Sequence, residues 1–190
     1  MTGEPRVAVA SYPGGIRVRS TWGGSGDGPA VLALSESGGA VVEHGPLVSP
    51  GFERLCRAEL RVETPAGPWT VRLASPIYDE PSAFLWDEPG LLVVGYGFFS
   101  YAFVARSGEL RWSHRSHTPL VAILGSSRIP HVIVQAEIET FAIEPDGEVA
   151  WRIAHSDVVT EAALVGGRLV LTSFSNQLSA LDPQTGRPTA

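Results

Sequence analysis

Short runs of apolar residues, separated by glycine, proline, serine and aspartate, recur along the chain. The runs are rich in Val, Ile, Leu and Phe, and turn-forming residues interrupt them about every 8–12 positions. Helices of a globular protein need longer segments with apolar residues at a spacing of three and four. The pattern therefore predicts an all-β protein built from short strands.

The turn glycines show that these strands belong to an internal repeat. Gly108, Gly147 and Gly186 are separated by 39 residues each time, and Trp112 and Trp151 keep the same interval. Each period contains four predicted strands, and four antiparallel strands in about 40 residues are the unit of a β-propeller blade. Such a unit buries both faces only against its neighbours, so we expect the repeated tryptophans to pack between units.

The repeat divides the chain into a regular and an irregular part. We predict one domain over residues 1–190, with regular repeats in 81–190 and irregular strands or blades in 1–80. The length corresponds to about five propeller-like units if residues 1–80 form two of them. Residues 6–12 can then supply a closing strand to the last unit. A β-sandwich whose repeated hairpins imitate blades is the alternative.

The C-terminal segment carries a family resemblance. LSALDPQTGRPT at 178–189 resembles the repeat of quinoprotein-type (PQQ-like) β-propellers, in which aliphatic-Ala-Leu-Asp-x-x-Thr-Gly precedes a tryptophan. The matching residues are Leu178, Ala180, Leu181, Asp182, Thr185 and Gly186, and the tryptophans occur in the two preceding copies. The resemblance covers about residues 81–190 and implies a propeller fold, related in plan to WD40-like repeats. With one cysteine, Cys56, the vicinal cysteine pair of quinone-dependent dehydrogenases is impossible, so we predict no quinone cofactor.

Charge and composition limit the partners and the compartment. The net charge is -6, from 20 acidic and 14 basic residues, and no basic run is present, which argues against nucleic acid. All the basic residues are arginine, as expected for a GC-rich bacterial genome. No apolar stretch approaches the roughly 20 residues that cross a bilayer, and the N-terminus lacks the parts of a signal peptide. We therefore expect a cytoplasmic bacterial protein without a membrane partner.

No motif in the chain predicts a catalytic, cofactor or metal site. His114 and His117 stand three residues apart on a predicted strand or loop, which directs them to opposite faces. The glycine-rich segment 23–29 lacks the following helix of a phosphate loop. The acidic pairs at 79–80 and 87–88 each precede a proline and are interpreted as solvated turns.

An aromatic cluster is the one candidate for a binding surface. GYGFFSYAF at 95–103 contains Tyr96, Phe98 and Phe99, and a hairpin tip near residues 97–100 would expose the two phenylalanines. Large exposed aromatics are typical of contact surfaces for proteins. The alternative is that these rings pack between blades.

Two classes of function remain open from the sequence. The first is a non-catalytic β-propeller-like module that binds a protein partner through Tyr96, Phe98 and Phe99, as a bacterial adaptor or toxin-neutralising protein would. The alternative is a small enzyme whose acids and histidines converge at the propeller axis. The repeat and the absence of a reactive motif favour the binding module, and the sequence makes no prediction of oligomeric state.

Overall fold

The structure is a computed structural model that describes residues 5–23, 41–44, 56–75, 77 and 79–189. These residues form strands, with one 3₁₀ turn (η1, Pro13–Gly15), which confirms the all-β prediction. The chain divides into two compact units. Unit 1 comprises Met1–Pro81 and Val104–Glu109, and unit 2 comprises Ser82–Phe103 and Leu110–Ala190. The predicted organisation, one domain with irregular strands or blades in residues 1–80 and regular repeats in 81–190, stays a prediction.

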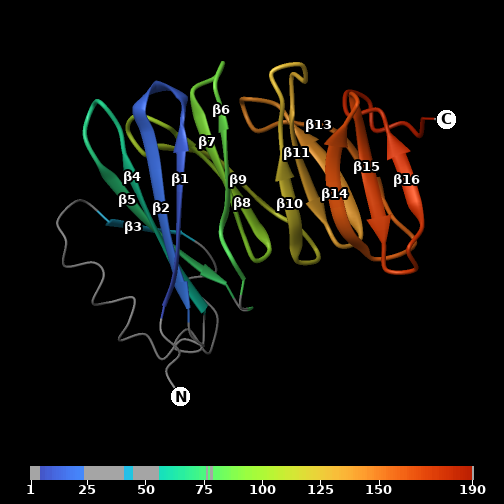
Figure 1. Ribbon diagram of the computed structural model, residues 1–190, viewed down its shortest axis with the longest axis horizontal. Coiled ribbons are helices and arrows are strands. Elements are labelled where there is room, and N and C mark those ends of the chain that lie inside the picture. The colour runs from blue at the N-terminus through green and yellow to red at the C-terminus, as the bar shows by residue number, and fades with distance from the viewer. Residues whose placement is uncertain (1–4, 24–40, 45–55, 76, 78, 190) are drawn as a thin grey trace. The chain divides into compact units, whose positions relative to one another are not determined.

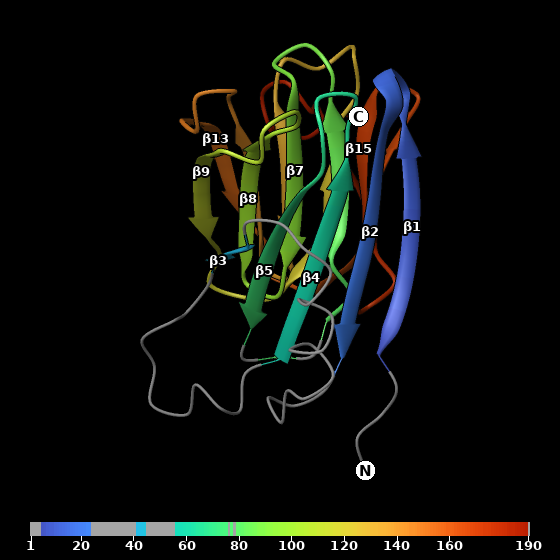
Figure 2. The ribbon, with the colours of Figure 1, turned by 90° about the vertical axis from the view of Figure 1, so that its left-hand side faces the viewer.

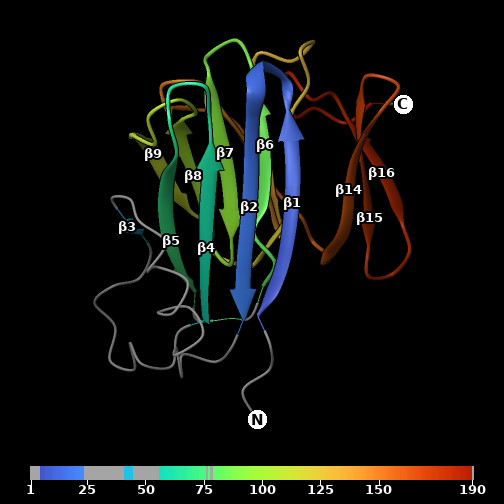
Figure 3. The same ribbon diagram turned by 60° about the vertical axis from the view of Figure 1, so that its left-hand side comes forward.

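Unit 1 contains a five-stranded sheet, sheet 1, in the order β1-β2-β4-β5-β3. The turned views show β1, β2, β4 and β5 side by side (Figure 2, Figure 3). The strands are β1 (Arg6–Tyr12), β2 (Ile16–Gly23), β3 (Val41–His44), β4 (Cys56–Glu63) and β5 (Trp69–Ser75). All neighbours are antiparallel except β3 and β5, which are parallel. The segment AVLALSE at 30–36, whose sequence also predicts a strand, lies outside the described residues.

Unit 2 contains three sheets, which follow one another along the unit (Figure 1). Sheet 2 consists of β6 (Ser82–Trp86), β7 (Leu91–Tyr96), β8 (Phe99–Val104) and β9 (Leu110–Arg115). Sheet 3 consists of β10 (Leu120–Leu124), β11 (Val132–Ala136), β12 (Glu139–Ile143) and β13 (Val149–Ala154). Sheet 4 consists of β14 (Val159–Val165), β15 (Arg168–Ser173) and β16 (Leu178–Leu181). Each sheet is a meander in which consecutive strands are neighbours, which makes the fold propeller-like.

The core of unit 2 lies between its sheets. Every residue of β7 and β11 is buried, because these strands are central in their sheets and covered on both faces. This explains why neither strand shows an alternating pattern, although β11 contains the polar Gln135. Sheets 3 and 4 share a cluster in which Ile133 and Ala142 meet Leu169, Leu171 and Leu181.

A tryptophan of one sheet packs on the turn glycine of the next. A methyl group on Gly147 would lie 2.8 Å from Cβ of Trp112, and one on Gly186 would lie 2.5 Å from Cε3 of Trp151. Both glycines also have positive φ, at which other residues are strained. The sequence prediction that the repeated tryptophans pack between units is therefore confirmed.

The same contact occurs inside unit 1, where spacing alone did not establish it. A methyl group on Gly108 would lie 2.6 Å from Cδ2 of Trp69, and the Trp69 indole N–H donates a 2.9 Å hydrogen bond to the Ala105 carbonyl. Trp69 begins β5, so this strand corresponds to β9 and β13 of the regular repeats. Sheet 1 is therefore a modified copy of the same unit.

Two finer expectations about residues 1–80 concern the number of units and the closing strand. The described residues contain four sheets, compared with a predicted total of about five units. The segment 6–12 forms β1 and pairs with β2 along its whole length, and its role as a closing strand of the last unit stays a prediction. The β-sandwich alternative is excluded, since successive hairpins form separate sheets.

Candidate functional site

One end of unit 2 is a continuous edge formed by turns and linkers. The β7–β8 and β11–β12 turns alternate there with the linkers that lead into β10 and β14, and backbone hydrogen bonds join them in series. The bonds run from Ser116 N–H to Phe98 C=O (2.8 Å), Glu137 N–H to Pro119 C=O (3.0 Å), His155 N–H to Ile138 C=O (2.8 Å) and Phe174 N–H to Val158 C=O (2.7 Å). Side chains on this edge are therefore held on a connected backbone.

Four apolar side chains on this edge, Phe98, Ile138, Val158 and Phe174, are here called the rim. Ile138 is 39% exposed, Val158 is 37% exposed and Phe174 is 77% exposed, while Phe98 is half-buried. Scattered single apolar residues are normal on a surface, but a row on one edge is typical of a contact site. The rim is therefore the candidate protein-binding surface.

The three aromatic residues singled out from the sequence have different environments. Tyr96 is 1% exposed, so its ring is buried in the core and is not available to a partner. Phe98 lies in the hairpin turn as predicted, and Phe99 begins β8. The half-buried Phe99 ring stacks on Tyr101 at 5.9 Å, and the Arg115 guanidinium lies 5.9 Å from its centroid. The structure thus brings Phe98 and Phe99 to the surface and leaves Tyr96 in the core.

Asp157 fixes the turn that presents Phe174. Its carboxylate accepts hydrogen bonds from the Ser175 hydroxyl, from the Ser175 backbone N–H at 3.2 Å and from the Val158 N–H at 2.8 Å. The hydrogen bonds of the Ser175 hydroxyl and then of the Ser173 side chain contribute most to lowering the pKa of Asp157 to about 2. The carboxylate is therefore ionised at neutral pH, and it holds the Phe174 turn against the β13–β14 linker.

A buried polar network lies next to the rim, because it includes His155, whose backbone N–H donates to the Ile138 carbonyl. The Thr140 hydroxyl donates to Oε1 of Gln135 at 2.5 Å and lies 2.6 Å from Nε2 of His155. Because the single hydroxyl proton goes to Gln135, His155 donates to Thr140 through Nε2–H. Burial lowers the pKa of His155, since the charged imidazolium loses hydration there.

This network predicts a pH dependence of stability. The folded-state pKa of His155 lies below its unfolded value, so the unfolded chain binds the proton first as the pH falls. The contribution of neutral His155 is complete above its ordinary pKa and is lost progressively below it. We expect the melting temperature to fall between pH 8 and pH 5.5, and to fall less in His155→Gln, which keeps a donor for Thr140. An equal decrease in both proteins, measured by circular dichroism, would contradict this assignment.

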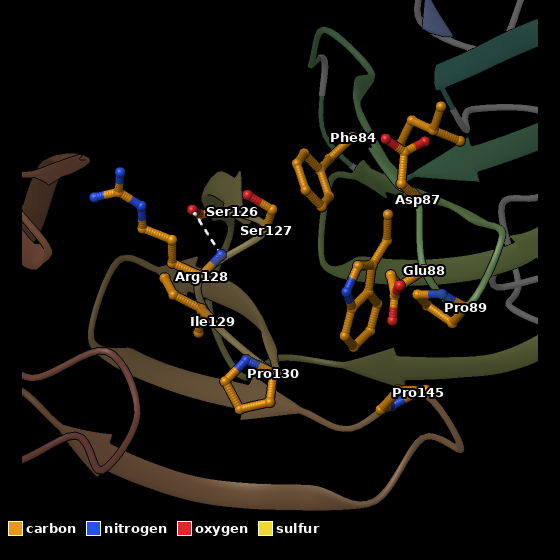
Figure 4. Close-up of a pocket in the computed structure, with 12 residues that line it drawn as sticks. Phe84, Asp87, Glu88, Pro89, Ser126, Ser127, Arg128, Ile129, Pro130 and Pro145 are labelled. Carbon is orange, nitrogen blue, oxygen red and sulfur yellow. Dashed lines mark hydrogen bonds between the residues drawn. The ribbon is translucent and has the colours of Figure 1, made fainter. Parts of the chain in front are cut away.

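The opposite ends of sheets 2 and 3 form a cleft of about 910 Å³. Figure 4 shows Phe84, Asp87, Glu88 and Pro89 on one side and residues 126–130 on the other. Phe84 packs on the backbone of sheet 3, because a methyl group on Gly125 would lie 2.2 Å from its ring. The sequence predicts a solvated turn at Asp87 and Glu88, which are exposed, but it does not predict the cleft beside them.

The histidines of unit 2 take part in separate structural contacts. Nε2 of His114 lies 2.7 Å from the Gly147 carbonyl, and Nδ1 of His117 lies 3.1 Å from Oε1 of Glu139. His131 lies 3.2 Å from the Glu144 carboxylate. Among the described residues, no group of three or more His, Cys, Asp and Glu side chains is placed to hold a metal ion. In the same part of the chain, no helix has the length and apolar character needed to span a membrane.

Comparisons with known proteins add similarity at the level of the fold. No protein-family model matches the chain, and no curated protein matches it. The similar solved structures include BamB from Moraxella catarrhalis (22% identity, TM-score 0.46) and the Neurospora crassa Pan2 WD40 domain (17%, 0.48), each covering 57% of this chain and 36% of its own. A HIRA fragment (12%, 0.49) covers 96% of this chain and 51% of its own. The chain thus spans between 36% and 51% of these structures. The propeller-like fold rests on the sheets described above, and the PQQ-like repeat stays a prediction.

Proposed function

We propose that the protein is a non-catalytic protein-binding module whose contact surface is the rim of unit 2, together with Phe99. The observation that carries this proposal is the row of exposed apolar side chains on one hydrogen-bonded edge, with Phe174 77% exposed. Tyr96 is left out of the surface because its ring is buried. As a finer proposal, the module is a cytoplasmic bacterial adaptor or toxin-neutralising protein built on PQQ-like repeats without a quinone.

The chemistry of the rim fits a protein surface better than a small ligand. Its residues lie in turns and linkers, and Ile138, Val158 and Phe174 are exposed, whereas small-molecule sites are concave and enclose their ligand. Aromatic residues contribute strongly at protein interfaces because they bury a large area with few rotatable bonds. The connected backbone of the rim also reduces the ordering cost of binding.

Affinity capture with matched variants tests this function. The tagged protein is incubated with lysate of its native cell, and bound proteins are compared for the wild type, Ile138→Ser/Phe174→Ser and Phe98→Ser/Phe99→Ser. We expect a specific partner whose recovery falls about tenfold or more in both variants, because loss of a central anchor costs roughly 2 kcal/mol or more.

Val9→Ser provides the control for this capture, since Val9 is 50% exposed in unit 1 and lies outside the rim. Circular dichroism spectra must match among all four proteins, so that lost binding cannot reflect lost folding. Recovery of the same partner by wild type and by both rim variants would refute the assignment of the rim. Equal loss in Val9→Ser would refute it as well.

A further inference from the structure

The cleft between sheets 2 and 3 lies at the end of these sheets opposite to the rim. The β6–β7 turn and the β10–β11 loop enclose it, whereas the rim is built from the turns at the other ends of β7 and β11. Twelve residues line it, and its volume of about 910 Å³ is large enough for several residues of an extended peptide. The cleft is therefore a second surface that a partner can use independently.

Trp86 provides an unused hydrogen-bond donor in this cleft. The residue is 7% exposed and lines the cleft, and its indole N–H has no acceptor among the described residues. The indole N–H groups of Trp69 and Trp151 donate to backbone carbonyls, whereas those of Trp22 and Trp112 are buried without a partner. Because the Trp86 N–H is not among the buried polar atoms that lack a partner, it opens to the cleft, where a ligand carbonyl can accept its hydrogen bond.

The charges of the cleft favour a basic ligand. Asp87 and Glu88 are exposed on the β6–β7 turn, and neither carboxylate forms an ion pair with a described residue. Arg128, on the opposite wall, extends away from this acidic pair (Figure 4). The acidic wall is therefore available to a guanidinium or ammonium group, which the neighbouring Trp86 and Phe84 rings would also attract.

The walls of the cleft suit an extended, proline-containing segment. Pro89, Pro130 and Pro145 are part of the lining, together with the half-buried ring of Phe84. The lining consists mainly of a turn and a loop, so the peptide would be recognised mostly by side chains rather than by pairing with a strand edge. Polyproline II segments bind in this way, because they expose their carbonyls and lose little entropy on docking to aromatic residues.

From these observations we propose that the cleft binds an extended, basic, proline-containing peptide segment of a partner protein. Trp86 donates to a backbone carbonyl of the peptide, and Asp87 and Glu88 pair with its basic side chain. This inference rests on the proposed protein-binding function, but it uses different residues from the rim.

Fluorescence anisotropy with a labelled peptide of three Pro-Pro-Arg repeats tests the proposal. We expect saturable binding that weakens at least about tenfold for Pro-Pro-Glu repeats, because the acidic wall repels them, and for Gly-Gly-Arg repeats, which are not preordered. Equal binding of the Gly-Gly-Arg peptide would overturn the proposal by showing simple charge attraction. Absence of binding by all three peptides would also overturn it.

Variants assign the binding to the named groups. Trp86→Phe keeps a ring but removes the N–H. We expect it to lower the affinity for the Pro-Pro-Arg peptide about fivefold or more. Asp87→Asn/Glu88→Gln should lower the peptide affinity by a similar factor. The control variant Glu109→Gln/Glu161→Gln, which changes two exposed acids outside the cleft, should leave the affinity unchanged. Unchanged affinity in both cleft variants would overturn the assignment.

The rim variant Ile138→Ser/Phe174→Ser separates this proposal from the proposed function. It should bind the Pro-Pro-Arg peptide like the wild type, because neither residue lines the cleft. If capture depends on the rim while the wild type binds no peptide, the cleft proposal fails and the proposed function stands. If the peptide binds through Trp86 while capture is independent of the rim, the cleft proposal stands and the rim assignment fails.

Discussion

Trp112→Ala is expected to lower the free energy of unfolding by about 3–5 kcal/mol, the usual cost of removing a buried tryptophan. Trp112 is 7% exposed, contacts the turn glycine Gly147 of the next sheet and meets the His114 ring edge-on at 5.6 Å. Its removal would leave a cavity where sheets 2 and 3 meet. Urea denaturation followed by circular dichroism measures the loss, and a value below roughly 1 kcal/mol would contradict the role given to this contact.

Trp151→Ala provides a comparison within the same repeat. Trp151 contacts Gly186 in the same manner, but its side chain is only half-buried. The sequence alone predicts the full loss of about 3–5 kcal/mol for this residue as well. With its partial exposure, we now expect a smaller loss than for Trp112.

Gly147→Ala is expected to cost about 2–5 kcal/mol, the second large effect. Gly147 has φ of +96°, and its added methyl group would lie 2.8 Å from Trp112 Cβ. The positive φ accounts for about 1–2 kcal/mol and overpacking against the indole for a further 1–3 kcal/mol. Denaturant unfolding of the purified variant measures the sum.

Gly90→Ala is the matched control for this substitution. Gly90 has φ of +67° in the β6–β7 turn, but a methyl group there would meet nothing within 4 Å. Gly90→Ala should therefore lower the free energy of unfolding only by the cost of the positive φ, about 1–2 kcal/mol. An equal loss of unfolding free energy in Gly147→Ala and Gly90→Ala would contradict a stabilising contact between Trp112 and Gly147.

The regular part of the fold was predictable because its determinants are local. Turn glycines with positive φ, such as Gly108 and Gly147, recur at a fixed interval and locate the hairpins. Between them, the lengths of the apolar runs define the strands, and β7 and β11 show no alternating pattern because both of their faces are buried. The 39-residue period then places the tryptophans between neighbouring sheets.

Unit 1 could not be predicted in the same way because its contacts do not follow the spacing. Trp69 stands only two residues after Gly67, yet it packs on Gly108 as the other tryptophans pack on their glycines. The parallel pairing of β3 with β5 joins segments whose order along the chain carries no periodic signal. A long connection between β2 and β4 further separates strands that are neighbours in the sheet.

The candidate sites were only partly visible in the sequence. Phe98 was noticed because aromatic residues cluster around it, whereas Ile138 and Phe174 are single apolar residues whose exposure depends on the turns that carry them. The cleft had a usable signal, since Asp87 and Ser126 are 39 residues apart and therefore occupy the same position in consecutive units. The unpaired indole N–H of Trp86, however, depends on three-dimensional surroundings that no spacing reveals.

A calorimetric titration of the captured partner, once purified, into the wild type and into Ile138→Ser/Phe174→Ser tests whether the rim binds it. We expect the dissociation constant to rise about tenfold or more in the rim variant, while the melting temperatures of the two proteins remain close. An unchanged dissociation constant would contradict the claim that the rim of unit 2 is the protein-binding surface.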